Sequence, residues 1–321
     1  MTHRDSGLAG GAGQDVGGWF RSAVDDAPVP RIRSWEPLGG HGQVSPDADV
    51  VAAAELLRGR PTMILTGAGA STASGLPDYR GPDATPRQPM TYQEFVSSDL
   101  ARRRYWARST VGWVAFGEAQ PNTVHHQVAR LAELVPVAGL VTQNVDGLHQ
   151  KAGSENVIEL HGSLDRAICL TCGLEAQRDE MQSWLLDLNP DVRSRLGQLA
   201  RETVSAPDGD AEVDRTETFE YPDCPRCGGI LKPDVVFFGE NARPEVVAAA
   251  FGVLDNAEVL VVLGSSLTVM SGLRFVRRAA RAGKTIIIVN DGNTRGDELA
   301  TIRLHGRVEN VLERWIQVLT Q

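Results

Sequence analysis

From Val50 onward, short apolar runs alternate with amphipathic stretches. The apolar runs have the length of buried strands, and they predict strands over 62–67, 137–142, 156–162, 258–266 and 284–291, with an extended segment over 234–240. Helical periodicity predicts helices over 50–59, 123–134, 244–257, 272–283 and 308–319. This alternation predicts an α/β fold, with a Rossmann-like parallel sheet covered by helices on both faces.

Two segments interrupt the alternation, and one precedes it. Residues 1–45 are Gly-rich with little apolar periodicity, so we expect a flexible arm. We expect residues 46–321 to form one catalytic domain, with a large Rossmann-like part made of 46–76, 121–163 and 232–321. The insertion 77–120 is predicted to be helical, and the insertion 164–231 contains every cysteine. We expect both insertions to form a smaller domain beside the sheet.

The charge of the chain limits its partners. Its 321 residues carry a net charge of −9, whereas nucleic-acid binding requires a basic surface, so we expect no nucleic-acid ligand. No apolar window has the length of a membrane span, and the N-terminus lacks the apolar core of a secretion signal. We therefore expect a cytoplasmic protein that does not bind membranes.

The four cysteines form two short-spaced pairs, Cys169-x-x-Cys172 and Cys224-x-x-Cys227. Two such pairs in a cytoplasmic chain are typical of a tetrahedral Zn²⁺ site. The alternative is two redox-active or merely buried pairs. Four thiolates leave no open coordination position, so we expect one structural zinc ion and place catalysis elsewhere.

Polar residues lie at the carboxyl ends of the predicted strands. Packing of a core strand does not account for them, because a buried polar group needs a hydrogen-bond partner. Gln143, Asn144, Asp146 and His149 follow the strand 137–142. Similar positions are held by the turn Gly67-Ala68-Gly69, by Gly264, Ser265 and Ser266, and by Asn290. Parallel sheets bind ligands at the carboxyl ends of their strands, and these residues suit a ligand with two phosphates and two riboses. The third glycine of a standard dinucleotide fingerprint is missing, because Thr72 stands there.

His161 ends another predicted strand, beside Gly162. A histidine whose pKa is near neutrality is a natural general base, so His161 is our candidate. His125, His126 and His149 are competitors, of which His125 and His126 lie on a helix face and suggest a structural role.

Together, the motifs GAGASTASGLPDYR, TQNVDGLH, ELHGS, the two CxxC pairs, LKPDVVFFGE, LGSSL and IVN strongly resemble those of the sirtuin family of NAD-dependent protein deacylases. The resemblance runs in order from about residue 48 to the C-terminus. The segments RYWARSTVGW and TRGDELA are most similar to the class II branch.

The resemblance implies NAD as cofactor and acylated-lysine proteins as substrates, with His161, Asn144 and Asp146 as catalytic residues. Gly67, Ala68, Gly69 and Ser71 would bind the pyrophosphate, and Asp78, Tyr79 and Arg80 would form the cofactor loop. Gln143, Asn144 and Asp146 would line the nicotinamide-ribose pocket. The adenosine half would contact Gly264, Ser265, Ser266, Asn290, Asp291, Gly292 and Val308.

The resemblance also implies a substrate site. Val235, Val236, Phe237, Phe238 and Gly239 would pair with the backbone of the substrate by strand addition. A Tyr-x-x-Arg pair binds the carboxylate of succinyl-lysine in the class III branch, so Tyr105 and Arg108 would recognise a polar acyl group; a helix-surface pair is the alternative.

The predicted reaction is NAD-dependent protein-lysine deacylation, giving nicotinamide and O-acyl-ADP-ribose. ADP-ribosyl transfer to protein, or lipoamidase activity on the same scaffold, is the main alternative. An NAD dehydrogenase and a non-catalytic NAD sensor are further alternatives.

Overall fold

The computed structural model describes residues 43–77, 89–202 and 216–321. Within these residues, a six-stranded sheet has the order β3-β2-β1-β7-β8-β9, and every neighbouring pair is parallel. Its strands are β1 (Thr62–Thr66), β2 (Val137–Thr142), β3 (Val157–Glu159), β7 (Val259–Leu263), β8 (Thr285–Asn290) and β9 (Ile302–His305). Strands β1 and β7 are buried at every position, as central strands covered on both faces should be.

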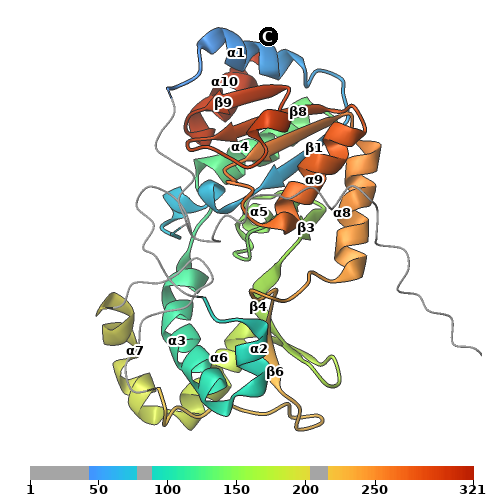
Figure 1. Ribbon diagram of the computed structural model, residues 1–321. Coiled ribbons are helices and arrows are strands. Elements are labelled where there is room, and N and C mark those ends of the chain that lie inside the picture. Colours follow the sequence, from blue (N-terminus) through green and yellow to red (C-terminus); the bar gives the residue numbers. More distant parts are fainter. Residues whose placement is uncertain (1–42, 78–88, 203–215) are drawn as a thin grey trace, which may run out of the picture. The chain divides into compact units, whose positions relative to one another are not determined.

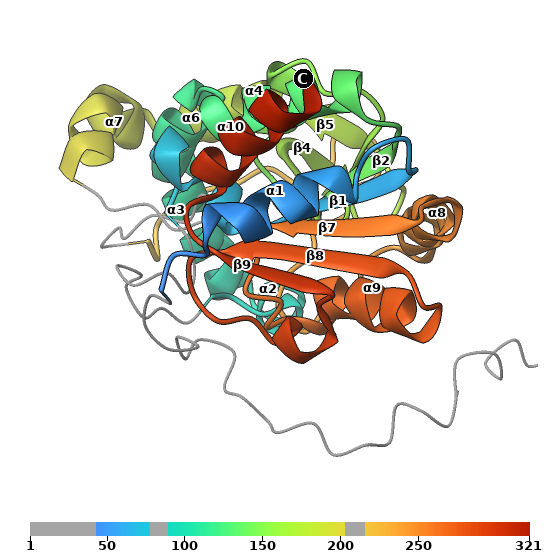
Figure 2. The same cartoon turned by 90° about the horizontal axis from the view of Figure 1, so that it is seen from above.

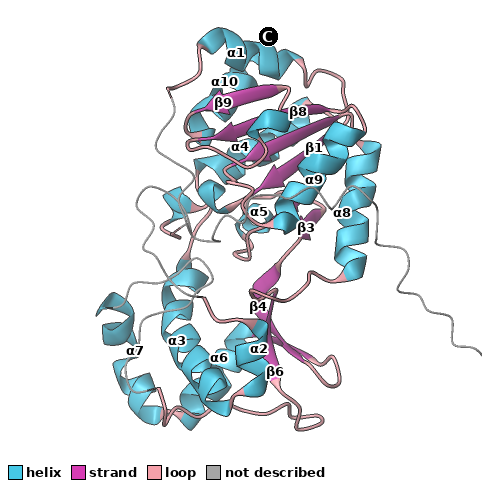
Figure 3. Ribbon diagram, in the orientation of Figure 1, coloured by secondary structure: helices cyan, strands magenta, loops and turns pink. Residues whose placement is uncertain are grey.

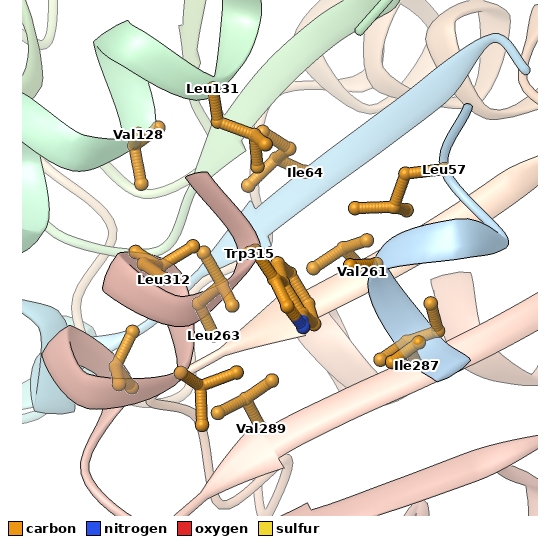
Figure 4. Close-up of a cluster of buried hydrophobic side chains, with 14 of the residues drawn as sticks. Leu57, Ile64, Val128, Leu131, Val261, Leu263, Ile287, Val289, Leu312 and Trp315 are labelled. Atoms are coloured by element: carbon orange, nitrogen blue, oxygen red, sulfur yellow. The ribbon is translucent and has the colours of Figure 1, made fainter. Parts of the chain in front are cut away.

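Helices cover both faces of this sheet (Figures 1 and 2). The first face is covered by α1 (Asp47–Glu55), α4 (Thr123–Leu134) and α10 (Val308–Leu319), and the second by α8 (Pro244–Asn256) and α9 (Met270–Arg281). Successive strand residues point to opposite faces: Ile64 packs with the first group of helices and Met63 with the second. Figure 4 shows the first cluster around Trp315, whose indole Nε1 donates to the Val50 carbonyl at 3.0 Å.

A second group of elements consists of an antiparallel sheet of order β5-β4-β6 and four helices; its strands β4 and β6 and the helices are labelled in Figure 3. Its elements are β4 (Gly162–Cys169), β5 (Glu175–Gln177), β6 (Leu231–Val235), α2 (Tyr92–Ser97), α3 (Asp99–Glu118), α6 (Arg178–Leu188) and α7 (Pro190–Glu202). Phe95, Trp106 and Leu231 are fully buried in a hydrophobic cluster of its own. The α/β fold with a smaller inserted part is therefore confirmed.

The remaining regular elements are short. They are α5 (Leu148–Lys151) and the 3₁₀ turns η2 (Ala68–Ala70), η3 (Thr72–Ser74) and η4 (Asp297–Leu299). None of the helices in the described ranges has the length and apolarity required to cross a bilayer.

The predicted element bounds are met in some places and missed in others. Strand 137–142 and helices 123–134 and 308–319 match β2, α4 and α10. Helix α1 begins three residues earlier than predicted, because Pro46 stands before it and Asp47 and Asp49 lie in its first turn. The edge strand β9 was not predicted.

Of the extended segment predicted over 234–240, the regular strand β6 ends at Val235, Phe238 still forms an isolated parallel bridge with Thr91, and the prediction is wrong only at the end of the segment, where the chain turns. The Glu240 carboxylate accepts a hydrogen bond from the Phe237 amide at 2.8 Å, and the Glu240 amide donates to the Phe237 carbonyl at 3.0 Å. Gly239 has a φ of +80°. The two hydrogen bonds close a turn over 237–240. The left-handed backbone of Gly239 also ends the extended chain, because a strand requires negative φ values.

Candidate functional site

Two loops meet at the carboxyl ends of β1 and β7. Gly264 has a φ of +60°, and its carbonyl accepts a hydrogen bond from the Gly69 amide at 2.9 Å. A Cβ on Gly264 would lie 2.7 Å from the Ala70 nitrogen, and a Cβ on Gly67 would lie 2.7 Å from the Ser265 Cβ. Glycine therefore lets the two backbones touch. The strand order reverses between β1 and β7, which is where open α/β sheets bind ligands.

The turn after β1 is built from η2 and η3. Its Gly69, Ala70 and Ser71 amides donate to the carbonyls of Gly264, Gly67 and Ala68. These donors are therefore used within the protein. The pyrophosphate role of this turn remains a prediction, and its continuation, Asp78, Tyr79 and Arg80, lies outside the described residues.

A polar network joins this turn to the end of β2. The Asn144 side-chain amide donates to the Gly67 carbonyl at 3.1 Å and to Ser71 Oγ at 2.9 Å. Ser71 Oγ in turn donates to Asp146 Oδ2 at 2.6 Å, and the Leu148 amide donates to Asp146 Oδ1 at 3.0 Å. These partners fix the Asp146 carboxylate and the Asn144 amide beside each other. Both were predicted for the nicotinamide-ribose pocket.

Gln143 connects β2 to the loop after β7. Its Nε2 donates to Ser265 Oγ at 2.8 Å and to the Thr66 carbonyl at 3.3 Å. Ser266 Oγ lies 3.0 Å from Thr268 Oγ1 in the same loop. The carboxyl ends of β1, β2 and β7 thus share one set of hydrogen bonds.

Two buried histidines lie beneath this network, and the sequence did not show that they meet. His125 from α4 and His149 from α5 have ring centroids 4.8 Å apart. His125 Nδ1 accepts from the Asn122 amide at 3.2 Å, and its Nε2 lies 3.4 Å from Ser71 Oγ. His149 Nε2 lies 2.9 Å from Thr66 Oγ1. Burial lowers the pKa of His125 to about 4 and the pKa of His149 to about 3. Both rings are therefore neutral supports of the site near pH 7.

His161 lies between β3 and β4. Its Nδ1 is 2.8 Å from the Gln143 carbonyl oxygen, and its Nε2 is 2.7 Å from Ser271 Oγ at the beginning of α9. Burial lowers the pKa of His161, and the bond to the Gln143 carbonyl opposes this shift. The imidazole is therefore neutral at pH 7, as a general base requires. No sequence motif pointed to Ser271.

The loop after β8 approaches the same edge of the sheet, since the Gly264 amide donates to the Val289 carbonyl at 2.9 Å. Asn290 Nδ2 donates to the Gly292 carbonyl at 2.7 Å. The Arg303 guanidinium of β9 donates to the carbonyls of Asn290 and Gly292 at 3.0 and 2.5 Å. Asp291 lies between these two anchored residues, while Val308 is the first residue of α10 and is 5% exposed. Only the fold reveals Arg303, because β9 was not predicted.

Part of the backbone of the predicted substrate segment, residues 235–239, is hydrogen-bonded to other parts of the protein. The Val236 amide donates to the His161 carbonyl at 2.8 Å, and the Phe238 carbonyl accepts from the Tyr92 amide at 2.9 Å. The buried Lys232 ammonium lies 3.1 Å from Glu240 and 4.6 Å from the Phe237 ring centroid. The position of this segment is thus fixed by both neighbours, and strand addition along all of it remains a prediction.

Tyr105 packs against this segment from α3. Its ring lies 5.2 Å from the Phe237 ring and 5.4 Å from the Phe95 ring, and the residue is 3% exposed. Arg108 lies one turn further along α3 and is half-buried. Tyr105 therefore belongs to the aromatic core around Phe237, beside the predicted substrate site.

The four cysteines converge between β4 and β6. The sulfur atoms of Cys169, Cys172, Cys224 and Cys227 all lie within 4.8 Å of one another, and two of the sulfur pairs are 3.6 and 3.7 Å apart. A tetrahedron with Zn–S bonds of about 2.3 Å has edges of about 3.8 Å. The cluster fits one structural zinc ion.

The fold and this edge of the sheet define a class: an α/β protein with a nucleotide-type site at the strand-order reversal and a four-cysteine metal cluster. A model of the Sir2 family matches residues 67–271. The chain is 50% identical over 257 residues to NAD-dependent protein deacetylase 1 of Mycobacterium avium, covering 80% of this chain and 91% of that protein. The chain belongs to the Sir2 family.

Other relatives agree. The chain is 47% identical over 267 residues to NAD-dependent protein deacylase SIR4 of Batrachochytrium dendrobatidis, covering 78% of this chain and 88% of that protein. A solved structure of Sir2 with a p53 peptide and NAD⁺ matches with a TM-score of 0.63 at 30% identity, covering 84% of this chain and 95% of the other. The predicted family is therefore confirmed.

Proposed function

We propose that this chain is an NAD-dependent protein-lysine deacylase that releases nicotinamide and O-acyl-ADP-ribose. Membership of the Sir2 family and the names of the relatives support this activity. The observation that carries the proposal is the His161 imidazole, held at both nitrogens beside the network of Asn144 and Asp146.

The residues present fit a dinucleotide. The glycines at Gly67, Gly69 and Gly264 keep side chains away from the edge of the sheet, and a Cβ on Gly69 would lie 2.9 Å from the Gly264 oxygen. When bound, NAD would supply a ribose carbon that exchanges its bond to nicotinamide for a bond to the acyl oxygen of the substrate lysine. Asn144 and Asp146 would orient the nicotinamide end, which is catalysis by placement and electrostatics. His161 Nε2 would accept the proton of a ribose hydroxyl.

The test incubates the protein with NAD and a panel of acyl-lysine peptides and measures nicotinamide and deacylated peptide together. We expect equal amounts of both products and no reduced cofactor. His161→Ala should lower turnover by about 10²–10⁴-fold with an unchanged thermal melt. Production of reduced cofactor would indicate a dehydrogenase, and label from NAD retained on protein would indicate ADP-ribosyl transfer. Full activity of His161→Ala would contradict the mechanism.

We propose further that Arg108 selects a polar acyl group. The contact between Tyr105 and Phe237 supports this, because it places the Tyr-x-x-Arg helix beside the predicted substrate segment. Arg108→Ala should lower kcat/KM for succinyl- and methylglutaryl-lysine by about tenfold or more relative to acetyl-lysine, since a charge-assisted bond contributes about 1.5–3 kcal/mol. Arg108→Lys is the matched control that keeps the charge. An unchanged order of substrates in Arg108→Ala would contradict the proposal.

A further inference from the structure

Ser271 is the second residue of α9 and lies 110 positions beyond His161 in the chain. Its Oγ is nevertheless 2.7 Å from His161 Nε2. The residue is half-buried, and it belongs to neither the network around Asp146 nor the glycine turn. The contact is therefore a separate link between α9 and the candidate base.

The direction of this hydrogen bond follows from the other ring nitrogen. His161 Nδ1 lies 2.8 Å from the carbonyl oxygen of Gln143, and a carbonyl oxygen can only accept. Nδ1 therefore carries the hydrogen, and in the neutral ring Nε2 presents a lone pair. The Ser271 hydroxyl donates to that lone pair. Both nitrogens of the ring are thus held, one by the end of β2 and the other by α9.

The missing side chain of Gly272 lets α9 approach the end of β2 closely. A Cβ on Gly272 would lie 2.5 Å from the Gln143 side-chain oxygen. That side chain is itself anchored, because its Nε2 donates to Ser265 Oγ at 2.8 Å. The first turn of α9 therefore contacts Gln143 at one residue and His161 at the residue before it.

We propose that Ser271 is a positioning residue for deacylation, whose hydroxyl holds the His161 ring in the orientation and tautomer with a basic Nε2. This rests on the proposed function, in which His161 accepts a proton from a ribose hydroxyl. A ribose hydroxyl that approaches Nε2 takes the place of the Ser271 hydroxyl as hydrogen-bond donor. The His161 ring is then already in the required orientation and does not have to rotate. Without the Ser271 hydroxyl, only the bond to the Gln143 carbonyl fixes the ring.

The test compares Ser271→Ala and Ser271→Thr with wild type, using an acylated peptide and NAD. It measures kcat, KM for NAD, and the exchange of labelled nicotinamide into NAD, which reports bond cleavage before the proton transfer. We expect Ser271→Ala to lower kcat for deacylation about tenfold, the scale of one lost hydrogen bond. Nicotinamide exchange and KM should stay within about twofold, and Ser271→Thr should restore kcat because it keeps the hydroxyl.

Ser183→Ala is the matched control, because Ser183 is an exposed serine of α6 whose hydroxyl donates only locally, to the Asp179 carbonyl at 3.0 Å. A wild-type kcat in Ser271→Ala would overturn the proposal. So would an equal loss of exchange and deacylation that Ser271→Thr does not restore, because that result indicates a structural role.

His161→Ala, measured in parallel, separates this proposal from the function on which it rests. If His161→Ala deacylates normally, the proposed function fails whatever Ser271 does. If His161→Ala is inactive and Ser271→Ala is normal, only the role of Ser271 fails. In the His161→Ala background, adding Ser271→Ala should leave nicotinamide exchange unchanged.

Discussion

Gly264 lies where the loop after β7 touches the turn after β1, and its backbone has a φ of +60°. Because it has no side chain, the two loops can approach this closely. A Cβ at this position would meet backbone atoms of Gly69 and Ala70. Backbone atoms cannot move aside as the end of a long side chain can. At the residue scale, this glycine is needed for both its conformation and its size.

Gly264→Ala should lower the free energy of unfolding by about 2–4 kcal/mol, because it combines a strained φ with a clash against backbone. Urea unfolding followed by circular dichroism measures the change. Gly252→Ala is the control, because Gly252 lies in α8, where an added Cβ would have open space around it. That substitution should stabilise the protein by up to about 1 kcal/mol. Equal effects of the two substitutions would contradict this account.

At the scale of elements, α4 and α5 meet through the ring contact between His125 and His149. Their pKa values, about 4 and about 3, are lowered mainly by burial. Asp146 raises the pKa of His125 and His126 lowers it, while His125 lowers the pKa of His149. Protonating either ring would place a charge in the interior beneath the polar network.

The free energy of unfolding should therefore depend on pH through these two residues. The unfolded chain binds their protons near pH 6.5, whereas the folded chain resists them down to about pH 4 and about pH 3. Their contribution is complete above about pH 6.5 and is lost as the pH falls, with a slope of about 1.4 kcal/mol per pH unit for each ring. Urea melts from pH 7 to pH 4 measure it. His149→Gln should reduce the slope, and an unchanged slope would refute this assignment.

At the scale of the whole molecule, β4 connects the candidate base to the metal cluster. It begins at Gly162, next to His161, and ends at Cys169. A Cβ on Gly162 would overlap the Asp234 carbonyl oxygen, so β4 and β6 meet closely at the site end as well. The cluster therefore anchors one end of β4, and His161 directly precedes the other end.

Removing zinc with a chelator should abolish deacylation and unfold the part around β4, β5 and β6, because zinc binding contributes on the order of 10 kcal/mol in small zinc modules. Metal analysis should give one zinc per chain before treatment, and zinc should restore activity. Cys224→Ser should reproduce the loss. A zinc-free protein with normal melting and activity would exclude a structural metal.

The sequence alone determined the α/β alternation, the cysteine cluster and the family, because periodicity, close spacing and ordered motifs are local properties of the chain. Gln143 and Asn144 could be placed at a strand end for the same reason. Glu240 shows the limit: its hydrogen bonds with Phe237 close a turn around Gly239, where the apolar pattern alone predicted a chain that stays extended to residue 240.

Tertiary structure alone decided which histidine nitrogen is basic and what holds it. The Gln143 carbonyl, the Ser271 hydroxyl and the His161 ring come from three separate elements, and no pattern within any one of them encodes their meeting. The same is true of the ring contact between His125 and His149. Such contacts arise only when the helices pack on the sheet, because packing brings together polar groups that lie far apart in the chain.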